Sequence, residues 1–128
     1  MSLMVTPNLL EQARAGKVND ADFLSCIADS LPYAWSMVTR LVGELRDGTA
    51  RFTVNQNVPQ TDEEWGQMFR LMASDSMRAA IERHYSVRLA FQNCCSVGVF
   101  PPGAEDERIE FTSPEAQVLN QKPELRNC

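Results

Sequence analysis

The chain has 128 residues, of which 44% are hydrophobic and 23% are charged. These fractions are typical of one folded domain spanning residues 1–128, and they argue against disordered, collagen-like and coiled-coil chains. Twelve lysines and arginines against 17 acidic residues give a net charge of −5. Nucleic acid and anionic membranes repel such a chain on average, so we expect neither as a partner.

The ends of the chain and its cysteines favour a cytoplasmic protein. No window approaches the ~18 consecutive apolar residues of a membrane span, and the start lacks the features of a secretory signal. Residues 1–5 are expected to be either disordered or an addition to the natural chain, and Met1 and Met4 are the two alternatives for the natural initiator. The four cysteines lack the spacing of a disulfide framework, and they are Cys26, Cys94, Cys95 and Cys128.

Cap and breaker residues predict three helices in the first part of the chain. Thr6 and Gly16 bound a helix over 7–15, Asn19 begins a second, and Pro32 ends it. The third helix, 33–46, has an apolar arc too wide for one packing surface. We therefore expect it to be a central core helix or to self-associate as a homodimer.

After this helix, the spacing of the apolar residues changes from the helical pattern to the alternating pattern of a strand. Phe52, Val54 and Val58 share one parity and predict the buried side of a strand, with the polar residues between them facing outward. A capping box formed by Thr61 and Glu64 begins a fourth helix. Another helix begins at Ser74 or Asp75 and ends near Tyr85.

Two more strands follow, over about 87–91 and 95–99. The alternation of apolar residues shifts parity after Asn93, which predicts a bulge or a turn there. Residues 101–108 are expected to form a loop, 107–111 a short edge strand, and 122–128 a tail, with a last short helix after Ser113. The predicted class is α+β, with about five short-to-medium helices and a small two- or three-stranded antiparallel sheet.

Cys94, Cys95 and His84 are the candidate catalytic residues. A thiolate nucleophile needs a base within hydrogen-bond reach, and His84 is the single histidine of the chain. Neighbouring residues on a strand point to opposite faces, so one cysteine, and not both, would serve such a site. The alternative is that both cysteines are small hydrophobic residues and that His84 caps a helix end.

The remaining ionisable residues predict no metal site and no cofactor. The cysteines and His84 lack the paired spacing of a zinc site. Asp62, Glu63 and Glu64 lie in the first turn of a helix, where negative charge meets the helix dipole, so capping explains them.

Aromatic and amide side chains supply the candidate ligand-binding residues. The aromatic ones line an apolar pocket with neighbouring methionines or simply form the core, while the amides supply hydrogen bonds if the strands pair. The candidates are Tyr33, Trp35, Trp65, Phe69, Phe91, Gln92 and Asn93.

These features predict a small cytoplasmic binding or adaptor protein, homodimeric through helix 33–46, with an unidentified protein or small-molecule partner. The alternative is a thiol-dependent enzyme or redox sensor that uses Cys94 or Cys95 with His84.

Overall fold

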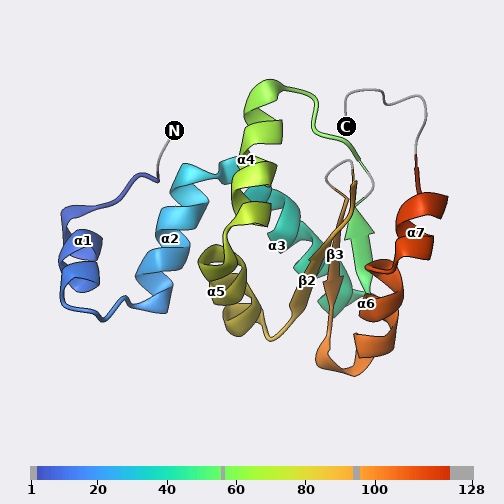
Figure 1. Cartoon of the computed structure of the whole chain (residues 1–128). Coiled ribbons are helices and arrows are strands. Elements are labelled where there is room, and N and C mark those ends of the chain that lie inside the picture. Colours follow the sequence, from blue (N-terminus) through green and yellow to red (C-terminus); the bar gives the residue numbers. More distant parts are fainter. Residues whose placement is uncertain (1–2, 56, 94–95, 122–128) are drawn as a thin grey trace.

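A computed structural model describes residues 3–55, 57–93 and 96–121 (Figure 1). It confirms the α+β class and the small antiparallel sheet, but it has seven α-helices where about five were predicted. None of the described helices is long and apolar enough to cross a membrane. The helices are α1 (Pro7–Arg14), α2 (Asp20–Ser30), α3 (Pro32–Asp47), α4 (Asp62–Ala73), α5 (Asp75–Tyr85), α6 (Glu105–Phe111) and α7 (Pro114–Leu119), and the strands are β1 (Thr53–Asn55), β2 (Arg88–Phe91) and β3 (Val97–Phe100).

Four of the predicted helix starts are confirmed by side-chain caps. The Thr6 hydroxyl accepts from the backbone N–H of Leu9, and Asn19 accepts from that of Asp22. The capping box at the start of α4 and the serine cap of α5 are also present. Such caps satisfy backbone donors that have no partner inside the helix, so short local motifs determine these boundaries.

The first described residues are bonded to α2. The backbone N–H of Met4 donates to the Ser30 hydroxyl at 2.8 Å, and the Cys26 thiol donates to the Met4 carbonyl at 3.4 Å. These contacts join Met4 to the C-terminal half of α2.

Helix α3 is covered within the chain. It packs against α2, against α4, and against strands β1 and β3 (Figure 1). Its buried residues are Ala34, Met37, Val38, Leu41 and Val42. The wide apolar arc therefore belongs to a central core helix, and the argument for a homodimer through residues 33–46 no longer holds.

The sheet has the order β1-β3-β2, and both pairings are antiparallel. The Cα partners of Val99 are Thr53 on β1 and Leu89 on β2. Strands β2 and β3 form the hairpin predicted near Asn93, and the backbone N–H of Gln92 donates to the carbonyl of Ser96 at 2.8 Å. Edge strand β1 thus joins the hairpin from a distant part of the sequence.

The two faces of β1 are the reverse of those predicted. Thr53 and Asn55 are buried against α3, whereas Phe52 and Val54 are half-buried on the other face. The Thr53 hydroxyl donates to the carbonyl of Leu41 at 2.9 Å. A polar side chain faces inward because α3 offers it a hydrogen bond, and alternation does not reveal such a partner.

The C-terminal part also differs from the prediction. Residues 101–108 contain a 3₁₀ turn, Pro102–Ala104, and the start of α6, and the edge strand predicted over 107–111 is helical. Helix α6 lies against β3 and β2 and forms a second core on the sheet face away from α3 (Figure 1). This core contains Phe52, Ala90, Phe100, Ala104 and Phe111. Because α6 covers that face, both sides of the sheet are buried.

Candidate functional site

The structure leaves the predicted cysteine and histidine site incomplete. Cys94 and Cys95 lie outside the described residues. His84 is exposed at the end of α5, with its ring edge-on to Tyr85 at 4.6 Å between centroids. Glu82, a carboxylate on the same helix, accepts from the backbone N–H of Leu89 at 2.9 Å. His84 therefore has a described aromatic neighbour and no described carboxylate that orients it.

The predicted ligand-binding residues are spread over several surfaces. The Trp35 ring lies 6.3 Å from that of Tyr85, while Trp65 stacks on Phe69 at 5.7 Å between centroids. Phe91 packs at the rim of the main core.

The remaining three lie near two separate cavities. Tyr33 lines a groove beside α3, and Gln92 lines another cavity between the sheet and α7. The backbone N–H of Asn93 donates to the Gln117 side chain at 3.1 Å. The set thus does not converge on one pocket.

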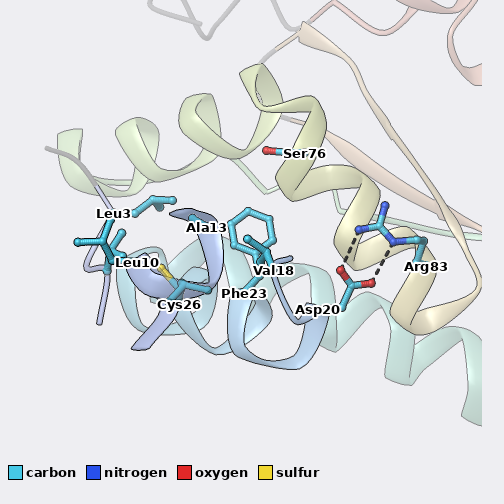
Figure 2. Close-up of a pocket in the computed structure, with 11 residues that line it drawn as sticks. Leu3, Leu10, Ala13, Val18, Asp20, Phe23, Cys26, Ser76 and Arg83 are labelled. Atoms are coloured by element: carbon cyan, nitrogen blue, oxygen red, sulfur yellow. Dashed lines mark hydrogen bonds and ion pairs between the residues drawn. The ribbon is translucent and has the colours of Figure 1, made fainter. Parts of the chain in front are cut away.

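An apolar cavity of about 550 Å³ lies between α1, α2 and α5 (Figure 2). Its lining is mostly apolar, and Figure 2 shows the Asp20–Arg83 pair at the end opposite Leu3 and Leu10. The Nε and Nη2 atoms of Arg83 each donate to one carboxylate oxygen of Asp20 at 3.0 Å. Since these charged groups satisfy one another, the cavity presents apolar surface and little directional chemistry.

The Asp20–Arg83 pair is expected to make stability depend on pH. The hydrogen bond from Arg83 lowers the pKa of Asp20 below its ordinary 3.8. A lowered pKa means that the stabilisation is present above the unfolded-state pKa and is lost as the pH falls through the folded-state pKa. Asp20→Asn should therefore lower the melting temperature slightly at neutral pH, and the gap from wild type should close below about pH 4. Thermal unfolding followed by circular dichroism measures this, and a gap that is constant with pH contradicts it.

Most arginines of the described chain are paired with carboxylates. Within the described residues, these six arginine charges are offset by neighbouring carboxylates. The pairs are Arg14–Glu11, Arg51–Glu107, Arg78–Asp75, Arg83–Asp20, Arg88–Glu82 and Arg108–Glu105.

Arg40 on α3 is held differently. Its guanidinium donates to the side-chain oxygen of Asn55 at 2.8 Å, and no carboxylate lies within ion-pair distance among the residues described. Asn55 is only 3% exposed and donates in turn to the carbonyl of Asn57 at 2.9 Å. A buried neutral amide thus orients an exposed positive charge without neutralising it.

The Arg40 groove is the cavity around this guanidinium, about 350 Å³, between α3 and the end of β1. Its lining combines a phenol ring, a hydroxyl, a guanidinium and amides, from Tyr33, Ser36, Met37, Arg40, Asn55 and Asn57. The helical spacing of Tyr33, Ser36 and Arg40 places them on one face of α3. The sequence signals that face as polar, but the pairing of Arg40 with Asn55 depends on the tertiary fold.

The chain matches one family model over residues 1–128, described as NucS shadow ORF under the name KH_NucS_shadow. No curated protein and no solved structure matches it. KH modules recognise nucleic acid, so the match overturns two expectations: a generic adaptor or thiol enzyme, and the exclusion of nucleic acid as a partner. The net charge of −5 was an average, and it misses single unneutralised groups such as Arg40. Because the match spans the whole length, the chain belongs to the NucS shadow ORF family.

Proposed function

We propose that this protein contacts single-stranded nucleic acid through the Arg40 groove. The observation that carries the proposal is the Arg40 guanidinium, exposed and oriented by the neutral, buried Asn55. A guanidinium binds a phosphate in a planar, two-pronged geometry, and phosphate contacts supply most of the affinity of non-specific binding. The family's name, which includes KH, supports the same class of partner.

The rest of the groove suits an unpaired strand better than a duplex. Tyr33 contributes a half-buried ring, and aromatic rings stack on unpaired bases without regard to sequence. Asn57 and Ser36 are exposed and neutral, so they add hydrogen-bonding groups without repelling phosphate. A duplex would need a broad positive surface, which the carboxylate-paired arginines do not provide.

The proposed contact differs from the usual KH clamp. KH modules hold the nucleic-acid backbone with a GXXG loop. The six glycines here include no two that are separated by two residues, and a single residue, Ser74, joins α4 to α5. The Arg40 groove therefore replaces that loop as the phosphate-binding element in our proposal.

The proposal is tested by fluorescence anisotropy with labelled single strands of DNA and of RNA, about 20 nucleotides long. We expect dissociation constants on the order of 10⁻⁴ to 10⁻⁶ M at physiological salt, and tighter binding at low salt. Arg40→Gln removes the phosphate contact, so it should weaken binding several-fold and reduce the slope of log affinity against log salt by about 0.7. Glu44 lies one helical turn from Arg40, so Glu44→Gln should strengthen binding.

Arg14→Gln is the matched control. Arg14 is an exposed helical arginine like Arg40, but it is paired with Glu11 at 3.2 Å and lies on α1, away from the groove. Its loss should leave affinity and salt slope unchanged. Equal losses in the Arg14 and Arg40 variants would assign binding to net charge alone, and absence of binding by wild type at low salt would reject the proposed function.

A further inference from the structure

The structure has a second polar cavity across β1 from the Arg40 groove. The cavity, about 340 Å³, lies between the outer face of the sheet and α6–α7. We call it the amide pocket, and its lining consists of Phe52, Val54, Gln92, Ser96, Phe111, Leu119, Asn120 and Gln121. Consecutive residues of a strand face opposite sides, so Asn55 reaches the Arg40 groove and Val54 reaches the amide pocket.

Two aromatic rings give the amide pocket its apolar walls. Phe52 stacks on buried Phe100 with 5.0 Å between ring centroids, and Phe111 lies 5.4 Å from the same ring. Both rings are half-buried, so each has an inner face packed in the second core and an outer part that lines the pocket. A flat ligand therefore meets aromatic surfaces that the fold already holds in place.

The polar rim is formed by amides and a hydroxyl with no net charge. The Gln92 amide nitrogen donates to the carbonyl of Phe111 at 2.6 Å, which orients the side chain and leaves its oxygen as an acceptor. Ser96 is half-buried and Asn120 is exposed, and together they add donors and acceptors. Neutral donors and acceptors beside aromatic rings match the edge and the face of a nucleobase.

We infer that the amide pocket receives one unstacked base of the strand whose phosphate binds Arg40. This inference rests on the proposed function, because it assumes that a single strand reaches the Arg40 groove. β1 is an edge strand of the sheet. A single-stranded nucleic acid that crosses this edge therefore passes from the Arg40 groove to the amide pocket without entering the core. Bases of single strands are recognised in this manner, stacked on aromatic rings and hydrogen-bonded at their edges.

The test compares four labelled homopolymers, each of one base, in DNA and RNA form. Wild type should bind the four homopolymers with unequal affinities. Comparison of the DNA and RNA forms shows which of the two nucleic acids supplies the base. Asn120→Ala and Ser96→Ala remove edge contacts, so each should bring the four affinities closer together. Phe111→Leu removes a stacking surface and should weaken all four by roughly 5- to 100-fold.

Because Phe111 belongs to the second core, circular dichroism checks that the Phe111→Leu variant is folded. If that variant is unfolded, the inference is judged from Asn120→Ala and Ser96→Ala alone. Asn8→Ala on α1 is the control, since Asn8 is exposed and lines neither cavity. If the polar variants leave the base preference unchanged while Arg40→Gln still lowers the salt slope, the base pocket is wrong and the proposed function stands. If wild type binds no homopolymer, both fall.

Discussion

Gly98→Ala is expected to lower the free energy of unfolding by about 1–3 kcal/mol, the usual cost of an extra methyl group in a filled core. A Cβ on Gly98 would lie 2.5 Å from Cε2 and 2.9 Å from Cζ of Phe100, and 3.5 Å from the Phe111 ring. A side chain on the surface moves aside cheaply, but Phe100 is fully buried and stacked on Phe52. The strand glycine therefore allows the Phe100 ring to lie across β3, where it supports the second core.

Gly43→Ala in α3 is the matched control, and it should change the free energy of unfolding in the opposite direction. A Cβ there meets nothing within 4 Å, and Gly43 is inside a helix. Alanine should raise stability by about 0.5–1 kcal/mol, because glycine loses more backbone entropy on folding. Urea unfolding of both variants measures the pair, and stabilisation by Gly98→Ala would show that the second core is loosely packed.

Gln67→Met should lower the free energy of unfolding by about 2 kcal/mol. The N-cap residue of α3 is Leu31, whose side chain makes no capping hydrogen bond. The Gln67 oxygen, from α4, accepts from the backbone N–H groups of Tyr33 at 2.7 Å and Ala34 at 3.3 Å. Gln67 is 3% exposed and Ala34 is fully buried, so a side chain of similar volume without an acceptor removes this cap and leaves the Ala34 N–H away from water.

Gln60→Met tests whether loss of a glutamine matters by itself. Gln60 is exposed before α4, and its side chain donates only locally, to the carbonyl of Val58 at 2.7 Å. Its replacement should change stability by no more than about 0.5 kcal/mol. Equal effects at the two positions, measured by urea unfolding, would contradict the capping role of Gln67.

The amino-acid sequence by itself determined where several helices of this protein begin. Thr6, Asn19, Thr61 and Ser74 begin helices because each side chain accepts from the backbone N–H three residues ahead. The shift in alternation after Asn93 predicted a bulge or a turn, and the antiparallel pairing of β2 with β3 agrees with the turn. All these interactions join residues close in sequence, so the pattern contains both partners.

The tertiary structure decided which surfaces are inside and where an unneutralised charge remains. The faces of β1 depend on α3, the helix over 105–111 depends on a sheet face that needs cover, and the cap of α3 comes from Gln67 on α4. Arg40 is a surface charge by its spacing, and it becomes a candidate phosphate ligand only through Asn55, 15 residues further along the chain. The physical reason is the same throughout: burial and hydrogen bonds between distant segments outweigh local pattern, and one sequence does not state which segments meet.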